Sequence, residues 1–484
     1  MQSANSFQID TNSVAGGPVA MSYDALDARG RRRAPVTKIV SEDRHLNARK
    51  RQKLMATTQD AARNFAITAW LIRKHVDYVS SFRFQAKTPD RGFNKAFEEW
   101  AERVGTRHNF DVARKHSRRR MMRLMETRAV TDGDHAWLKL RSGRHRGKVQ
   151  AIASDLIRMP NSDMPRGDDR ESWINGAKVD LQTGEALRYA LCQRQRVGQS
   201  LKLSRIVPAR NVIMRGYYER AGEDQVRGVS PLSTALNSLR DTYEGFDYAL
   251  AKLKTAQLFG LKIMRNASRP LDPGDETEEY NVDPNRGIFQ LELDPGDDAD
   301  FLEAKTPARE TTEFLRLVIL VALKAIDVPY SFFDESFTNF YGSRGGLIQY
   351  LQSCKPKRED NKEALDAHTR WRAGLDVADG QLELPQGKDF SFLRWEWVPD
   401  GIPWWDPAKE IRGKLMAIRA GLSSPQRECR ETGTNFEDNL QEIADALKLA
   451  EQLGVDLYFG DGGGIDLESL KAAADAQETP DDDD

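Results

Sequence analysis

The segment from Val226 to Met264 restricts the possible folds of this chain more than any other part of its sequence. It opens with a turn at Gly228, and Pro231 suits the first position of a helix, where its missing N–H is not needed. The Ser230 hydroxyl stands ahead of it as a candidate cap. Apolar residues then recur at steps of three and four, which predicts a long helix: Leu232, Leu236, Leu239, Tyr243, Phe246, Leu250, Leu253 and Ala256. Such a helix needs neighbours along its whole length. Taken alone, it also fits a core helix of an α-rich enzyme.

A strand-like run, FGLKIM, follows this helix, and a small β module and a second helix come next. Further strand-like runs lie at Gly287 to Leu293 and at Phe301 to Lys305. The helix predicted from about Pro307 to Asp327 is apolar nearly all round between Phe314 and Leu323, so it should be buried on most sides. That apolar run is too short to span a bilayer, which favours a packed helix.

A polar loop follows the second helix. Its sequence, DESFTNFYGSRGG at Asp334 to Gly346, contains three glycines, which predict a mobile backbone. An ordinary surface turn between two helices is the alternative interpretation. We expect another helix from Leu347 to about Trp371, with a break near Pro356.

Composition fits a large soluble assembly protein but does not identify one. The 484 residues suggest roughly three domains, and an apolar fraction of 39% is enough for packed cores. A net charge of −2 gives no global basic bias, which argues against an ordinary DNA-binding protein. Cys192, Cys354 and Cys429 are far apart without a CxxC pair, so we expect reduced structural thiols in a cytosolic setting. Neither a signal peptide nor a membrane-spanning run is expected.

The sequence contains no common catalytic motif. GxxxxGK[ST] does not occur, and GDGGG at Gly460 to Gly464 lacks the lysine that a phosphate-binding loop needs. HExxH, GxSxG and clusters of His, Asp and Glu are also absent from the sequence. His135, in the strand pattern HAWLKL, is expected to be packed rather than catalytic. We therefore predict no catalytic residue, no cofactor and no metal.

Several stretches occur in an order typical of one family. RGVSPLSTALNSLRDTYEGFDYALAKLKTA precedes NFYGSRGGLIQYLQ, a tryptophan- and proline-rich stretch follows at Phe392 to Gly433, and NFEDNLQEIADALKLAEQLGV comes last. Upstream lie TDGDHAWLKL (Thr131 to Leu140) and VDLQTGEALRYAL (Val179 to Leu191). From about Leu54 to Val455, the chain resembles the portal proteins of tailed bacteriophages, lambda-type family, with a first stem helix, a channel loop, a closing helix and paired wing strands at these places. The family often has a serine pair and an alanine after the loop's aromatic residue, where this chain is rich in glycine.

The resemblance implies an α+β portal fold in a ring oligomer, with an α/β wing, a two-helix stem, a small β clip, a channel loop with a long following helix, and a helical crown. The implied order is a basic N-terminal arm (1–53), the first part of the wing (54–228), stem helix 1 (229–257), the clip (258–305), stem helix 2 (306–330), the channel loop (331–346), the long helix and second part of the wing (347–407), the crown (408–459) and an acidic flexible tail (460–484).

The implied function is that of the portal vertex protein of a tailed phage or prophage capsid. A ring, expected to be a dodecamer, would form the channel through which the large terminase packages double-stranded DNA and through which the DNA later leaves. The major capsid protein and the head-tail connector are the other implied partners. The implied location is the virion, with the host cytoplasm during assembly and no membrane. The alternatives are another head or connector protein, disfavoured by the order of elements, and a phage DNA-processing enzyme, disfavoured because no metal-binding carboxylates stand at motif spacing.

The residues expected to act in this function lie in two groups. The candidate DNA contacts of the channel loop are Phe337, Asn339, Phe340, Tyr341, Ser343 and Arg344. Because Arg344 is the only basic side chain among them, contact should be weak and compatible with sliding. The candidate subunit contacts are Leu320 and Val321 of the second stem helix, and Arg118 and Arg119 of a basic helix.

Two stretches are strongly basic. We expect a helix with Val112, Met121, Leu124 and Met125 facing inward and with these cations: Arg114, Lys115, Arg118, Arg119, Arg120, Arg123 and Arg128. For this helix, contact with a neighbouring subunit is favoured over contact with DNA phosphates. The basic stretch from Tyr23 to Lys53 predicts an extended arm that lies across a neighbouring subunit or touches nucleic acid, with a solvated tail as the alternative. The resemblance of Tyr23, Asp24 and Ala25 and the arginines after them to the opening of the lambda-type family implies an ordered arm on the ring surface.

Overall fold

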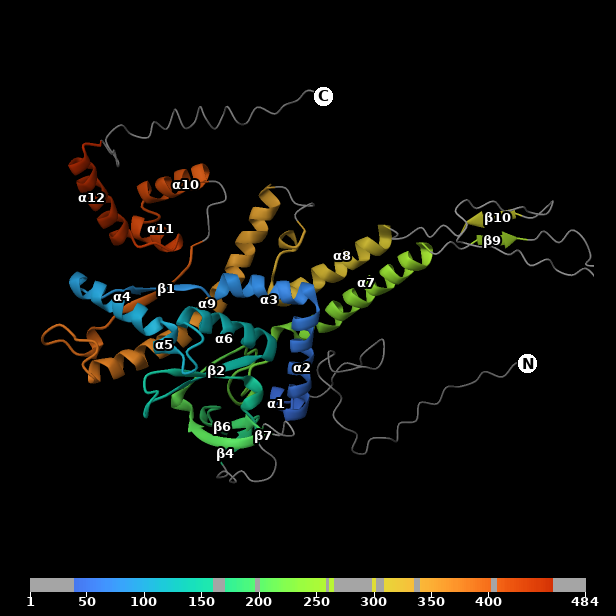
Figure 1. Ribbon diagram of the computed structural model, residues 1–484, viewed down its shortest axis with the longest axis horizontal. Coiled ribbons are helices and arrows are strands. Elements are labelled where there is room, and N and C mark those ends of the chain that lie inside the picture. The colour runs from blue at the N-terminus through green and yellow to red at the C-terminus, as the bar shows by residue number, and fades with distance from the viewer. Residues whose placement is uncertain are drawn as a thin grey trace, which may run out of the picture. The chain divides into compact units, whose positions relative to one another are not determined.

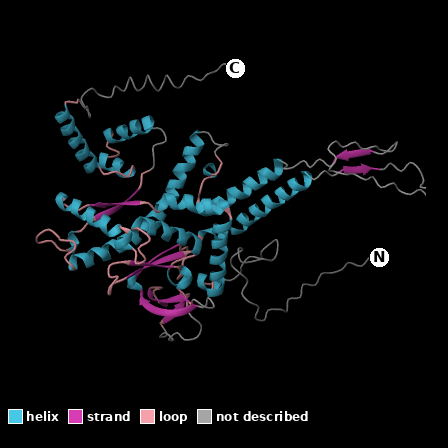
Figure 2. Ribbon diagram, viewed as in Figure 1, coloured by secondary structure: helices cyan, strands magenta, loops and turns pink. Residues whose placement is uncertain are grey.

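The computed structural model describes residues 39–159, 170–195, 201–257, 261–264, 298–301, 309–334, 340–401 and 407–455. Two compact units make up the chain: Met1–Val79 with Arg107–His368, and Ser80–Thr106 with Thr369–Asp484. Helices and antiparallel sheets occur in both units, which confirms the predicted mixture of helix and sheet (Figure 1, Figure 2).

Two antiparallel sheets lie in the first unit. In one of them, β2 (Asp134–Lys139) is central, between β3 (Val149–Ile152) and β8 (Val212–Gly216). The other has the strand order β4 (Glu171–Ile174), β5 (Ala177–Asp180), β6 (Ala186–Arg194) and β7 (Leu201–Pro208). Side chains of both sheets meet in one apolar core, formed by Ala136, Leu138, Ile152, Ile157, Ala177, Val179, Tyr189, Leu191 and Val207.

The two predicted wing strands do not pair with each other. The run at 131–140 forms β2, which pairs with β3 and β8, whereas the run at 179–191 contains β5 and β6, which pair locally. A tight turn closes this hairpin, since Gly184 has a φ of +72° and its N–H donates to the Asp180 carbonyl at 2.8 Å. Closing so short a loop costs little conformational entropy, which favours pairing between neighbouring strands.

Helices pack beside these sheets. α2 (Ala48–Asn64) begins at Asn47, whose side chain accepts the N–H of Lys50, and α6 (Arg118–Asp132) begins at Ser117, whose hydroxyl accepts the N–H of Arg120. α6 contacts β2, α2 and α3 (Ala66–Val79). The shorter helices of this part are α1 (Glu42–His45), α5 (Arg107–Phe110), η2 (Ser154–Leu156), η3 (Ala209–Asn211) and η4 (Gly222–Asp224).

The prediction of an extended arm to Lys53 is wrong for residues 42–53, which form α1 and the start of α2. The reason is a buried helical stripe: Arg51, Leu54, Met55 and Thr58 all lie on the inner face of α2. The arm up to residue 38 lies outside the described residues, as does the predicted acidic tail.

The long helix predicted after Ser230 is present in two parts. A short 3-10 helix, η5 (Pro231–Thr234), precedes α7 (Leu236–Gln257), so Pro231 starts the 3-10 turn rather than the α-helix. The Ser230 hydroxyl accepts the N–H of Leu232 at 3.2 Å, as expected of a cap. α8 (Arg309–Leu323) lies beside α7 (Figure 1) and continues into η6 (Lys324–Ile326), and the separate η7 (Tyr330–Phe332) follows.

Between α7 and α8, β9 (Leu261–Met264) pairs with β10 (Asp298–Phe301). The predicted strand at 301–305 is therefore shifted, because β10 ends where the prediction begins. Residues 302–305 and the predicted strand at 287–293 lie outside the described residues.

α9 (Phe340–Ala378) is longer than predicted, and the expected break at Pro356 does not occur. Proline removes one backbone donor and disfavours a helix interior. Buried side chains on both sides of Pro356, including Tyr350, Cys354 and Asn361, anchor the helix to the first unit. This tertiary packing outweighs the local preference.

The second unit has an aromatic core. β1 (Phe82–Ala86) pairs antiparallel with β11 (Trp395–Pro399), and α4 (Arg91–Gly105) contacts β1. Ring contacts join Phe84, Phe93, Phe97, Trp100 and Trp397. Its other helices are η9 (Phe390–Phe392), α10 (Pro407–Arg419), α11 (Pro425–Glu431) and α12 (Phe436–Leu453). The last three lie in the stretch from residue 408 that was predicted to be helical. No helix among the described residues is long and apolar enough to cross a membrane.

Candidate functional site

The α7–α8 pair presents an apolar surface to solvent. On α8, Ile319, Ala322 and Leu323 are buried, but Phe314, Leu317, Leu320 and Val321 are exposed by 62%, 57%, 36% and 54%. Among the described side chains of α7, the large apolar ones that are exposed are Phe246, Tyr248 and Leu250. The expectation that α8 is buried on most sides therefore holds for one face only within the single chain. Several exposed apolar side chains on one helix pair are typical of a protein–protein contact.

A glycine brings the two helices close together. A Cβ atom at Gly245 of α7 would lie 2.7 Å from Cδ2 of Leu315 on α8, so the absence of a side chain lets Leu315 approach the α7 backbone. Nearer the base of the pair, Ala235 and Leu239 pack against Ala322. Small residues at these contacts allow the two helices to pack closely.

The predicted channel residues separate into two groups. Phe337 and Asn339 lie outside the described residues, whereas Phe340, Tyr341, Ser343 and Arg344 lie in the first turns of α9 rather than in a loop. The predicted loop boundary at Gly346 is therefore wrong. Interior glycines cost a helix only about 1 kcal/mol each, which the buried residues farther along α9 can offset.

The subunit-contact candidates of the basic helix are on α6. Met121 and Met125 are buried, as predicted, and Leu124 is partly buried. Val112 precedes the helix and is partly buried. Arg119 is exposed and Arg118 is half-buried at the first helical position.

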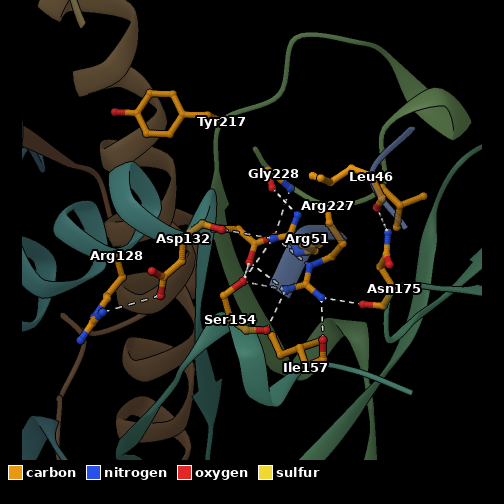
Figure 3. A network of polar contacts seen from close by, with 12 residues as sticks. Leu46, Arg51, Arg128, Asp132, Ser154, Ile157, Asn175, Tyr217, Arg227 and Gly228 are labelled. Carbon is orange, nitrogen blue, oxygen red and sulfur yellow. Dashed lines mark hydrogen bonds and ion pairs between the residues drawn. The ribbon is translucent and has the colours of Figure 1, made fainter. Parts of the chain in front are cut away.

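A buried polar network, the Asp134 network, lies at the base of α7 and consists of Arg51, Asp134, Ser154, Arg227 and Gly228 (Figure 3). Arg227 donates to both Asp134 oxygens, at 2.7 and 2.8 Å, and Arg51 donates at 2.9 Å. Burial would raise the pKa of Asp134, but the two guanidinium groups outweigh burial and lower this pKa well below its usual range. The carboxylate is therefore charged, fully paired and inaccessible.

This network fixes the chain just before η5 and α7. The Gly228 N–H donates to Asp134 at 3.0 Å, and its carbonyl accepts from Arg51 at 2.5 Å. A Cβ at Gly133 would lie 2.4 Å from the Gly228 oxygen, so the two backbones touch. The role that follows is mechanical: α7 starts from a rigid attachment to β2. The sequence analysis did not predict a role for Arg51 or Arg227. The one pattern that could have indicated Arg51 is its helical spacing from the buried residues Leu54, Met55 and Thr58.

A second buried cluster, the Glu126 network, consists of His75, Glu126, Arg215, Tyr217 and Tyr350. Tyr217 donates its hydroxyl proton to Glu126, and the His75 ring nitrogens lie 3.1 Å from the Tyr217 oxygen and 3.2 Å from the Tyr350 oxygen. Burial would raise the pKa of Glu126, but Arg215 and His75 lower it to about 2. Burial lowers the pKa of His75, and the hydrogen bonds of this histidine join elements α3, α6, β8 and α9.

Neither network has the composition of a catalytic or metal site. Asp134 is paired with two arginines, and Glu126 accepts a hydrogen bond from Tyr217 and lies 3.5 Å from Arg215, so both carboxylates are held in ion pairs with buried arginines. Within the described ranges, no group of three or more His, Cys, Asp or Glu side chains could bind a metal ion, and all three cysteines are free.

A family model described as phage portal protein, lambda family, matches residues 29–358. No match was found among curated proteins. Among solved structures, a chain from the virion of a native gene transfer agent particle is 13% identical with a TM-score of 0.46, over 79% of this chain and 98% of that chain. A chain from the neck of that particle, determined with C12 symmetry, is 12% identical with a TM-score of 0.48, over 78% and 93%. An HK97-family phage portal protein from Corynebacterium diphtheriae is 12% identical with a TM-score of 0.32, over 73% and 96%.

Proposed function

Because this chain belongs to the lambda family of phage portal proteins, which are structural proteins of the capsid vertex and not enzymes, we propose that it forms a ring at one vertex of a tailed phage or prophage head. The ring, a dodecamer, encloses the channel through which the large terminase drives double-stranded DNA into the head. The same channel releases the DNA later and docks the head-tail connector, while the outer surface of the ring contacts the major capsid protein.

The observation that carries this proposal is the unpartnered apolar face of the α7–α8 pair. Leu317 and Val321 are more than half exposed although they lie on a helix packed along its neighbour. A second subunit would cover this face, and a closed ring gives every copy the same two neighbours. Leu320 and Val321 are thus proposed subunit contacts. Arg118 and Arg119 of α6 are proposed to pair with acidic groups of the adjacent subunit.

The proposed assignment of parts follows the element order. α7 and α8 are the two stem helices, β9 and β10 belong to the clip, and the helices from α10 to α12 form the crown. The sheets of the first unit belong to the wing. The segment from Ser331 to the second turn of α9 faces the channel, where Phe340, Tyr341, Ser343 and Arg344 meet the DNA.

A pair of charge substitutions on α8 tests the ring. Leu320 is partly exposed in the single chain, whereas Leu323 is fully buried. We expect Leu320→Glu to fold normally but to lose the ring, because an unpaired carboxylate in a desolvated contact costs several kcal/mol per subunit. Leu323→Glu should instead unfold the first unit.

Size-exclusion chromatography, negative-stain images and circular dichroism distinguish these outcomes. The unmodified protein should give rings with a central hole. Rings of unchanged size from Leu320→Glu would contradict the stem assignment, and monomers from the unmodified protein would contradict the proposed function.

A further inference from the structure

A strongly basic surface of the first unit lies outside the α7–α8 pair. Residues 107–120 and 140–148, the basic patch from here on, contain ten lysines and arginines, and their one carboxylate is Asp111. The whole chain, by contrast, has 72 Lys and Arg against 74 Asp and Glu. Positive charge is therefore concentrated locally in a chain that has no overall basic bias.

Backbone contacts bring the two segments of the basic patch together. Asp111 and Val149 form a parallel bridge, in which the Val112 N–H donates to the Val149 carbonyl at 3.0 Å. The Lys148 ammonium donates to the His108 carbonyl at 2.6 Å. The turn between β2 and β3 therefore lies against the chain that leads into α6, and their cations share one surface.

Asp111 shapes this surface. Its side chain is buried and accepts the backbone N–H groups of Ala113, Lys115 and His116 at 3.0 to 3.1 Å. The turn that results gives Arg114 a φ of +56°, a conformation that non-glycine residues rarely adopt. The single carboxylate of the basic patch is thus occupied by the backbone, and the turn directs Arg114 and Lys115 toward solvent.

Most of the exposed side chains of the basic patch are cationic. Arg114, Lys115, Arg120, Arg141 and Arg144 are exposed. No large apolar side chain is exposed in the two segments, both of which the structure describes completely. Protein contacts usually centre on apolar or aromatic anchors, so this composition favours a polyanion bound by charge.

We propose that the cations of the basic patch other than Arg118 and Arg119, which are proposed subunit contacts, bind the phosphate backbone of double-stranded DNA without reading its sequence. The inference rests on the proposed function, because that function brings the protein next to double-stranded DNA. Eight of the ten cations are arginines, and the planar guanidinium group suits the oxygens of a phosphate. This surface is separate from the channel segment, in which Arg344 is the one basic residue between Asp334 and Gly346.

Fluorescence anisotropy with a labelled duplex of about 30 base pairs, titrated between about 50 and 200 mM salt, tests the proposal. The variant Arg141→Glu/Arg144→Glu changes two exposed side chains of the β2–β3 turn. We expect its affinity at about 0.1 M salt to fall by roughly tenfold or more, and the slope of log affinity against log salt to decrease by about two. The matched control is Arg188→Glu/Lys202→Glu, which changes the charge equally at exposed positions outside the basic patch and should keep the affinity within about twofold.

Three results would overturn the proposal. The unmodified protein could fail to bind DNA, both double variants could lose affinity equally, or poly-glutamate could compete as well as DNA at equal charge, which would indicate an acidic protein partner. Negative-stain images of the same preparations separate this test from that of the proposed function. If the protein forms rings but Arg141→Glu/Arg144→Glu leaves its DNA affinity unchanged, only the proposed role of the basic patch is contradicted. If no rings form, only the portal assignment is contradicted.

Discussion

At the scale of single residues, the first unit contains charges that solvent does not reach. The side chains of Asp134 and Glu126 are fully buried, and each carboxylate meets arginine nitrogens. A buried ion pair adds little net stability over apolar packing, but breaking it is costly because one charge remains buried without its partner. The two networks should therefore act as rigid attachments whose loss is felt by the whole first unit.

Asp134→Asn should destabilise the first unit by about 3–5 kcal/mol, because Arg51 and Arg227 would lose their common carboxylate. Asp77→Asn is a matched control, since Asp77 pairs with Arg123 at 2.6 Å where both side chains are 40% or more exposed. Its cost should stay below about 1 kcal/mol. Urea unfolding measures both, and equal effects of the two substitutions would contradict the proposed role of the Asp134 network.

His135 gives the stability of the protein a predictable dependence on pH. Burial, and then Arg128, lower its pKa from 6.5 to about 4, and neither ring nitrogen has a hydrogen-bond partner among the described residues. The unfolded chain therefore binds a proton at a pH where the folded chain does not. The contribution of His135 to the free energy of unfolding is fully present above pH 6.5 and is lost as the pH drops toward 4, by a few kcal/mol at most.

Replacing His135 with phenylalanine should flatten that part of the pH profile. The midpoint of thermal unfolding, measured from pH 7 to pH 4, should fall less steeply for His135→Phe than for the unmodified protein. Parallel profiles would show that other groups dominate acid sensitivity in this range.

At the scale of elements, the periodicity of apolar residues predicted the main helices and strands. It failed where contacts between residues far apart in the chain determine the local structure. The stripe from Leu232 to Ala256 identified the long helix, and the strand pattern around His135 identified β2. The break expected at Pro356 is absent because buried neighbours from other elements stabilise α9.

The candidate site was harder to predict from the sequence than the fold. Arg51 looked like part of a basic tail, yet it is buried, and its guanidinium group donates a hydrogen bond to Asp134, 83 residues away in the chain. The basic patch combines two segments that only the bridge between Asp111 and Val149 brings together. Partners so far apart in the chain leave no local pattern.

The start of α9 offers a direct test of helix against loop. A Cβ at Gly345 would meet no atom within 4 Å, whereas one at Gly346 would lie 3.3 Å from Ser331 Oγ and 3.4 Å from Pro329 Cβ. Gly345→Ala should therefore raise stability by about 0.5–1 kcal/mol, because alanine loses less backbone entropy than glycine. Gly346→Ala should gain less. Thermal unfolding measures both, and a destabilising Gly345→Ala would restore the loop interpretation.

At the scale of the whole molecule, the distribution of charge matters more than its sum. A net charge of −2 combines the basic patch with acidic stretches elsewhere in the sequence. A channel that lets DNA slide needs weak attraction for phosphates, since each neutralised phosphate strengthens binding and slows passage. Strong positive charge can therefore lie on another surface of the subunit, but it would impede movement at the channel.

Arg344 is where this argument can be tested in assembled particles. It is half-buried in the second turn of α9, and it is the one basic residue of the proposed channel segment. We expect Arg344→Ala to leave the rings intact but to reduce the amount of DNA retained in filled heads, because a weak contact that slows backward slippage would be lost. The control is Arg73→Ala, which removes an exposed arginine from α3. Ring images and the DNA content of purified heads measure the two effects separately. If heads carrying Arg344→Ala retain as much DNA as the control, the start of α9 does not touch the DNA, and the channel lining must be sought on α7 and α8.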